Sequence, residues 1–112
     1  MNTLPIINLT YEIYKNVVDI VYHSEKRWRY GLGASTEQSV LDLLKELIMA
    51  KNAPRPLKFP FLISAESYLE ITVLKTRLFL ELKICNETKI FQLQKKLAKT
   101  GRMLGGWTKA CK

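Results

Sequence analysis

The chain has 112 residues, a length that fits one domain whose core is large enough to need no disulfide or metal to hold it. Apolar residues make up 47% of the sequence, which excludes an intrinsically disordered chain. The formal net charge is +8, so nucleic acid is the first partner class to consider and an anionic membrane surface the second.

The first predicted helix begins at Pro5, because proline in the first helical turn sacrifices no hydrogen bond, and it runs to about Tyr22. Apolar residues recur along it at heptad spacing, at Ile7, Tyr11, Tyr14, Val18 and Val21. We expect a break near His23 and Ser24, with Ser24 as the N-cap of the next helical segment.

A short basic and aromatic cluster follows this break and comprises Lys26, Arg27, Trp28 and Arg29. We interpret Trp28 first as a cover over the edge of the core, with stacking on a nucleobase or on a neighbouring subunit as the alternative. Gly31 and Gly33 leave the start of the next helix open, since they fit either a loop or the interior of a long helix.

The second long helix is clear from Ala34 and ends near Lys51. Its apolar pattern consists of Val40, Leu41, Leu44, Leu47 and Ile48. The following segment, 52–60, holds three of the four prolines and is too short to link domains, so it is predicted to connect two helices.

The third long helix is predicted from Pro60 to about Ile84 and is apolar over more than one stripe. Its apolar residues are Leu62, Ala65, Leu69, Ile71, Val73, Leu74, Leu78, Phe79, Leu80, Leu82 and Ile84. A helix with apolar residues on several faces is buried on several sides. We interpret the excess as an oligomer interface; a central helix in a monomer and a strand-like segment at 71–73 are the alternatives.

The last stretch, 86–112, contains seven lysines and arginines and one acid, which gives it +6 of the net charge of +8. At about 100° per residue, one face carries Ile90, Leu93, Leu97, Leu104, Trp107 and Cys111, with a gap at Thr100. The opposite face carries Lys95, Lys99, Arg102 and Lys109. The helix is therefore predicted to have one face for a protein core and one face for an anionic partner.

The single sign of this charged face is informative. Solvated helix faces usually mix glutamate with lysine, because like charges four residues apart destabilise a helix by a few tenths of a kcal/mol. Lys95 and Lys99 form such a like-charged pair, which does not help folding and suits a polyanion. We therefore predict nucleic-acid binding by Lys95, Lys99, Arg102 and Lys109, and by Lys26, Arg27 and Arg29; a merely solvated face is the alternative.

Gly101 and Gly105 lie one turn apart beside the apolar seam, where missing side chains allow another helix to come close. With Leu104 and Trp107 they are predicted to form packing or oligomer contacts. Gly105 and Gly106 also fit a C-cap that would end the helix. We prefer a continuous helix, because Trp107 stays in phase with the seam.

No pattern of catalytic or metal-binding residues stands out. The single histidine, His23, has no glutamate three residues before it, and no set of Cys, His, Asp and Glu has metal-ligand spacing. The acidic residues are scattered without an evident pair. We expect a non-enzymatic protein without a cofactor or metal.

The sequence shows neither a secretory leader nor an apolar run of the roughly 20 residues that a membrane span needs. The two cysteines, Cys85 and Cys111, fit small apolar residues of a reducing compartment, and a disulfide between them stays open. We expect a cytoplasmic protein without a membrane partner.

Four helical segments with short connections predict an all-α fold, an antiparallel up-down four-helix bundle that forms a single domain over residues 1–112. Three of the four predicted helices have a single apolar stripe, and the helix predicted from Pro60 has a wider apolar surface. This pattern fits a bundle that assembles further.

Several segments, in this order, resemble a known family. They are Arg29-Tyr30-Gly31-Leu32-Gly33, the leucine-rich second helix, Ala65 with Leu69, Glu70 and Leu74, and Thr100-Gly101-Arg102-Met103-Leu104-Gly105-Gly106-Trp107. The terminal motif is most similar to the accessory variability determinant proteins of diversity-generating retroelements. These belong to a four-helix-bundle family related to proteins encoded in intervening sequences of 23S ribosomal RNA genes. The resemblance covers residues 5–112.

This resemblance implies a barrel-shaped homopentamer with a basic surface and no catalytic activity. It also implies binding to a reverse transcriptase and to nucleic acid, RNA or DNA, in support of mutagenic retrohoming. The alternative is a structural or protein-interaction bundle, like the intervening-sequence proteins, that docks an acidic partner.

Overall fold

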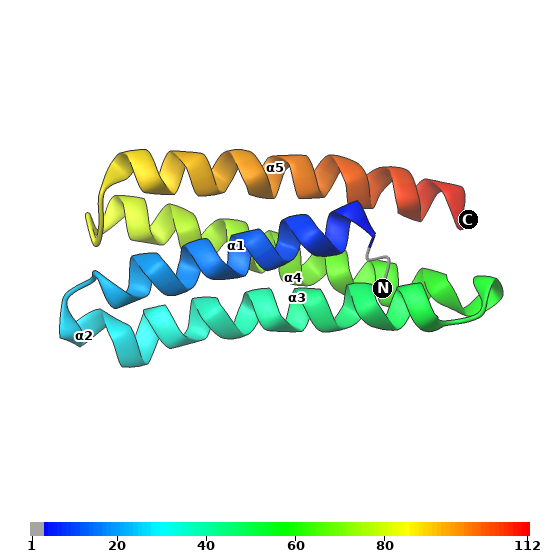
Figure 1. Ribbon diagram of the computed structural model, residues 1–112, viewed down its shortest axis with the longest axis horizontal. Coiled ribbons are helices and arrows are strands. Elements are labelled where there is room, and N and C mark those ends of the chain that lie inside the picture. Colours follow the sequence, from blue (N-terminus) through cyan, green and yellow to red (C-terminus); the bar gives the residue numbers. More distant parts are fainter. Residues whose placement is uncertain (1–3) are drawn as a thin grey trace.

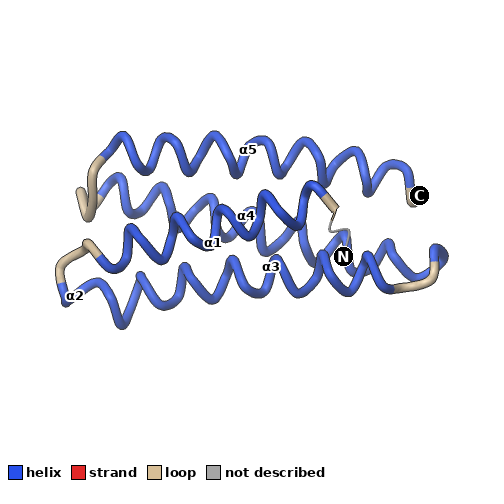
Figure 2. The backbone as a smooth tube through the Cα atoms, viewed as in Figure 1, coloured by secondary structure: helices blue, strands red, loops and turns tan. Residues whose placement is uncertain are grey.

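The computed structural model describes residues 4–112, which contain helices and turns and no strand. Four long helices lie side by side along the longest axis, namely α1 (Pro5–Tyr22), α3 (Ala34–Asn52), α4 (Lys58–Glu81) and α5 (Glu87–Ala110) (Figure 1). Three short helical segments complete the described chain, namely α2 (Lys26–Trp28), the π-helix η1 (Arg29–Gly33) and the 3-10 helix η2 (Arg55–Leu57). Short connections join the long helices, and their loop segments lie at the two ends of the molecule (Figure 2). The predicted all-α class is confirmed.

Each long helix packs against two others. α1 contacts α3 and α5, and α4 contacts the same two helices. The result is a compact, elongated body of 45 × 25 × 21 Å with one shared core.

All four long helices supply aliphatic side chains to this core. The largest fully buried aliphatic residues are Ile13, Leu43, Leu47, Leu62, Ile90, Leu97 and Leu104. Burial of each such side chain contributes about 1.5–3 kcal/mol to folding.

Threonines are buried among these side chains in every long helix. Those that are at most 1% exposed are Thr10, Thr36, Thr72, Thr76 and Thr100. Thr100 donates its hydroxyl hydrogen to the Lys96 carbonyl at 2.9 Å, one turn back in its own helix. Because the hydroxyl keeps a hydrogen bond, its burial costs little. Thr100 thus fills the position that the apolar pattern of α5 left as a gap.

The buried face of α1 differs from the predicted heptad face. Tyr11 is 53% exposed and Val18 is 39% exposed, whereas Ile13 and Val17 lie in the core. The heptad pattern counted tyrosine as a core residue and did not count Thr10, whose hydroxyl bonds to a carbonyl of its own helix at 2.8 Å. The predicted face was therefore rotated by about one residue.

The buried face of α3 is shifted in the same way. Of the predicted apolar residues, Val40 and Leu47 are fully buried, whereas Leu41 and Ile48 are 37% and 39% exposed. Leu43, which the predicted pattern left out, is also fully buried. The polar Ser39 shares the buried face, and its hydroxyl donates to a carbonyl one turn back at 3.1 Å. A pattern of apolar residues alone again misses part of the buried face, because residues with hydroxyl groups belong to it.

The connection from α1 to α3 is helical for most of its length. The predicted break is present, but Ser24 is not the N-cap of the next segment, because Glu25 holds that position. The Ser24 hydroxyl instead donates to the Ile20 carbonyl at 2.7 Å, so it completes the end of α1. Gly31 and Gly33 lie inside the π-helix η1, which leads directly into α3.

Gly33 is tightly packed within this connection. A Cβ atom there would lie 2.8 Å from Val21 Cγ1 and 2.9 Å from the Trp28 carbonyl oxygen, so the backbone or Val21 would have to move. At Gly31 a Cβ atom would meet nothing within 4 Å. Trp28 is half-buried against the edge of the core, as its first interpretation predicted.

α4 begins slightly before the predicted Pro60 and ends before the predicted Ile84. Lys83 adopts a left-handed backbone with φ of 53°, and the N–H of Ile84 donates to the Phe79 carbonyl at 3.0 Å. Together with the bond from Lys83 N–H to Leu80 at 3.2 Å, this is a Schellman motif. The end of α4 was not predicted because apolar residues continue past it, at Leu82 and Ile84, and because no glycine occupies the left-handed position.

α5 begins after Asn86, whose Oδ1 accepts a hydrogen bond from Thr88 N–H at 2.8 Å. It continues through Gly105 and Gly106 to Ala110, which confirms the continuous helix. The two cysteines, just before and just after α5, are free. The 24 residues of α5 separate them by about 36 Å, so a disulfide within one chain is excluded.

Candidate nucleic-acid interface

α5 separates its apolar and basic side chains. At most 2% of each of Ile90, Leu93, Leu97 and Leu104 is exposed, and Trp107 and Cys111 are half-buried against the same core. Lys95, Lys99, Arg102 and Lys109 are all exposed. The two faces predicted for this segment are present.

Three of these basic residues gather on one concave area. Lys95, Lys99 and Arg102 line a shallow depression of about 400 Å³ together with Lys96 and Ala98. Among residues 4–112, none of these three has an acidic group within ion-pairing distance. Their positive charge is therefore not balanced by an ion pair with any of the described residues.

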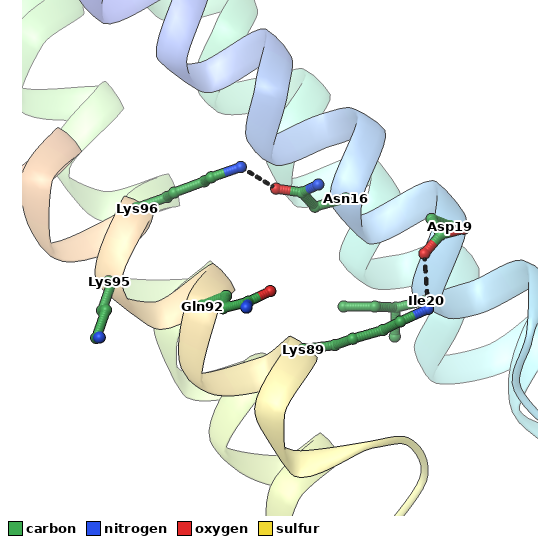
Figure 3. A pocket seen from close by; sticks show the side chains of 7 residues that line it. All are labelled: Asn16, Asp19, Ile20, Lys89, Gln92, Lys95 and Lys96. Atoms are coloured by element: carbon green, nitrogen blue, oxygen red, sulfur yellow. Dashed lines mark hydrogen bonds and ion pairs between the residues drawn. The ribbon is translucent and has the colours of Figure 1, made fainter.

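A second hollow, of about 490 Å³, lies between α1 and α5 (Figure 3). It is lined by Asn16, Asp19, Ile20, Lys89, Gln92, Lys95 and Lys96. Lys95 and Lys96 line both hollows, so the two form one continuous surface along α5. Figure 3 shows the Lys95 side chain pointing away from α1.

Two lysines of this surface are tied to α1. Lys96 Nζ donates to Asn16 Oδ1 at 2.7 Å, and Lys89 Nζ donates to Asp19 Oδ2 at 3.0 Å (Figure 3). The hydrogen bond from Lys89 holds the pKa of Asp19 below its usual value, so the carboxylate is ionised at neutral pH. Positive charge is thus balanced at the Asp19 end of the hollow and unbalanced at the Lys96 end.

The other predicted basic group lies at the end of the molecule where α5 begins (Figure 1). Lys26 is exposed. Arg27 pairs with Glu25 at 3.2 Å, and Arg29 Nε donates to the Ser24 carbonyl at 3.1 Å. Two of the three side chains are therefore already engaged within the chain.

Lys109 lies near the other end of α5. It is not among the residues that line the depression formed by Lys95, Lys99 and Arg102. The structure thus brings together Lys95, Lys99 and Arg102, and places Lys109 and the α2–η1 group apart from them.

The predicted packing residues of α5 differ in their surroundings. Leu104 is fully buried and Trp107 is half-buried within the chain itself. A Cβ atom at Gly101 would lie 3.5 Å from Leu69, an ordinary contact, and one at Gly105 would meet nothing within 4 Å. Any close helix approach at Gly105 would have to come from another chain.

The sequence pattern missed the α1 side of the interface. Asn16 and Asp19 of α1 were not predicted, although they line the larger hollow, and neither was Gln92 of α5. The period of a helix identifies its own faces, but it does not say which residues of a neighbouring helix lie opposite. No signal in the sequence pairs Lys96 with a residue 80 positions away.

Comparison of this chain with models of known protein families gives no match, and neither does comparison with curated proteins. In the part of the chain that the structure describes, no group of three His, Cys, Asp or Glu residues could hold a metal ion. None of the helices within 4–112 has the length and apolar character to cross a bilayer. The fold and the surface define a class only: a helical protein with a concave basic face.

Proposed function

We propose that this protein is a non-enzymatic subunit that binds nucleic acid through the basic face of α5. The observation that carries the proposal is the convergence of Lys95, Lys99 and Arg102 on one depression without acidic partners among the described residues. Phosphates that bind such a surface release condensed counterions, which drives association. Binding is largely independent of base sequence, because phosphate contacts carry no base information.

The biological setting we propose is the one that the sequence resemblance implies. The protein acts in the cytoplasm as an accessory variability determinant of a diversity-generating retroelement. There it binds the reverse transcriptase and supports mutagenic copying of a template RNA. The motif at 100–107 supports this setting, since it spans the part of α5 that carries Arg102 on the basic face.

A titration with labelled RNA and DNA at several salt concentrations tests the binding. We expect log K to fall linearly with log salt, with a slope of about −0.9 for each phosphate neutralised on duplex DNA and about −0.7 on single strands. Three phosphate contacts predict slopes of about −3 and −2. An affinity that does not respond to salt would rule out phosphate binding by this face.

A second candidate, a protein-interaction bundle that docks an acidic partner, uses the same basic face. Pull-down of the reverse transcriptase after nuclease treatment separates the two: retention without nucleic acid indicates direct protein contact, and loss indicates a nucleic-acid bridge.

The surface of α4 supports assembly into an oligomer. Ile71, Leu74 and Leu78 of α4 and its C-cap residue Leu82 follow one another at helical spacing and are 39–58% exposed. Beside them, an apolar hollow of about 420 Å³ lies between α4 and α5 and is bordered by Gly101. Contiguous exposed apolar surface is typical of interfaces. We propose that bundles of antiparallel up-down topology associate through this face into a barrel-like homopentamer, the subunit number being implied by the resemblance.

Light scattering tests the assembly. A pentamer would have a mass of about 65 kDa, five times the 13.0 kDa of one chain. Leu74→Glu is expected to dissociate it, because a charge in an apolar interface is costly to bury. Leu57→Glu is the matched control, since Leu57 and Leu74 are both 58% exposed and Leu57 lies outside this face. A parent protein that is monomeric at micromolar concentration would refute the assembly.

A further inference from the structure

Tyr22, the last residue of α1, is a large aromatic side chain left in water. It is 70% exposed, so it contributes little to the core. The Arg29 guanidinium carbon lies 5.9 Å from the centre of its ring, and the His23 ring meets it edge-on with 5.1 Å between centroids. Exposed aromatic rings, together with arginine side chains, are the groups on which proteins stack unpaired nucleobases.

A chain of contacts connects this ring to the hollow between α1 and α5. His23, in contact with Tyr22, has its Nδ1 3.3 Å from Asp19 Oδ1. The other oxygen of Asp19 accepts the hydrogen bond from Lys89 at 3.0 Å. Asp19 lies three residues before Tyr22, about 4.5 Å along the helix axis. The ring therefore lies just beyond the Asp19 end of the hollow.

The uneven charge of the hollow favours different parts of a nucleotide at its two ends. Asp19 and Lys89 balance each other at one end, so that end attracts phosphates little, whereas Lys95 and Lys96 attract them to the other end. Gln92, between the two lysine contacts in Figure 3, offers an uncharged amide to a sugar or base edge. Phosphates are thus favoured near Lys96, and the uncharged part of a nucleotide is favoured toward Tyr22.

We propose that the hollow between α1 and α5 and the ring of Tyr22 bind a single nucleic-acid strand, with phosphates at Lys95 and Lys96 and an unpaired base stacked on Tyr22. This rests on the proposed function and adds the class of ligand. Bases inside a duplex already stack on both faces, so apart from the terminal pairs they are not available to the ring. The protein accordingly prefers single strands to duplex of the same sequence.

Fluorescence anisotropy with a short labelled oligonucleotide, as RNA and as DNA, single-stranded and annealed to its complement, tests the proposal. Tyr22→Ala is expected to weaken single-strand binding by about 5- to 150-fold, the equivalent of about 1–3 kcal/mol for one stacked base. Duplex binding is expected to change by less than about twofold. The salt slope stays the same, because the variant loses no charge. The RNA and DNA probes show which strand chemistry the site prefers.

Two variants serve as controls. Tyr22→Phe keeps the ring and is expected to bind like the parent. Tyr11→Ala removes another exposed tyrosine of α1, 53% exposed and beside Lys15 at 5.4 Å. It lies about 16 Å from Tyr22 along the helix, so its binding should also equal that of the parent. Thermal melts check that each variant folds.

The outcomes separate this proposal from the general one. Salt-dependent binding by the parent with no effect of Tyr22→Ala overturns the stacking site and leaves nucleic-acid binding intact. An equal loss on single strands and duplex also overturns it. If the parent binds none of the probes, both proposals fail. A selective loss on single strands, restored by Tyr22→Phe, establishes the site.

Discussion

Gly33→Ala is expected to destabilise the fold by about 1–3 kcal/mol, as overpacking of a filled site does. The added Cβ atom would lie 2.8 Å from Val21 Cγ1 and 2.9 Å from the Trp28 carbonyl oxygen. One of these neighbours is backbone, so rotation of a side chain alone does not relieve the contact. The turn that joins α1 to α3 would therefore have to shift.

Gly31→Ala is the matched control, two residues earlier in the same π-helix. Nothing lies within 4 Å of the added atom. Alanine is favoured over glycine in helices by roughly 0.5–1 kcal/mol, so this variant should be slightly more stable than the parent. Denaturant unfolding of the three proteins at equal concentration measures both effects. Equal midpoints for Gly33→Ala and the parent would show that Val21 does not pack on Gly33.

Reversing the charge of Lys95, Lys99 and Arg102 to glutamate is expected to abolish nucleic-acid binding and leave the fold intact. Three positive charges become negative, so the formal net charge of the chain falls from +8 to +2. The local field then repels phosphates. All three side chains are exposed, and surface substitutions of this kind usually change stability by less than about 0.5 kcal/mol each. A gel-shift titration and a thermal melt give both quantities.

Leu97→Ala is the opposite control on the other face of α5. Leu97 is 1% exposed, and truncating a buried leucine costs about 2–5 kcal/mol through lost burial and the cavity left behind. The Leu97→Ala variant keeps the surface charge of the parent, so it should bind nucleic acid like the parent below its melting temperature. If the charge-reversal variant binds like the parent as well, the basic face is only solvated.

The two faces of α5 were predictable because both follow from one helix and its period. Leu93 and Leu97 point into the core, and Lys95 and Lys99 lie exposed on the opposite side. Position along a single helix is information that the sequence carries directly.

The buried faces of α1 and α3 were less predictable, because they include hydroxyl residues. Thr10 and Thr36 look polar in the sequence, yet each is buried and donates its hydroxyl hydrogen to the carbonyl four residues earlier. Counting apolar residues alone therefore selects Tyr11 and Leu41, which are exposed. The end of α4 was also not predictable, because the left-handed residue that follows it, Lys83, is not a glycine.

The larger hollow could not be predicted, because it depends on which helices are neighbours. Asn16 and Lys96 meet only because α1 and α5 pack side by side. The same holds for the chain of contacts from Lys89 through Asp19 to Tyr22, which joins two helices that are far apart in sequence.

Phosphate binding by the basic face of α5 is best tested by the salt dependence of the affinity. The measurement compares the parent with a variant in which Lys95, Lys99 and Arg102 are all changed to glutamine. Each lost phosphate contact flattens the slope of log K against log salt by about 0.7 on single strands and about 0.9 on duplex DNA. Loss of three phosphate contacts should make the slopes of the variant shallower by about 2 on single strands and about 2.7 on duplex DNA, with weaker binding at low salt. Equal slopes and equal affinities for the two proteins would contradict it.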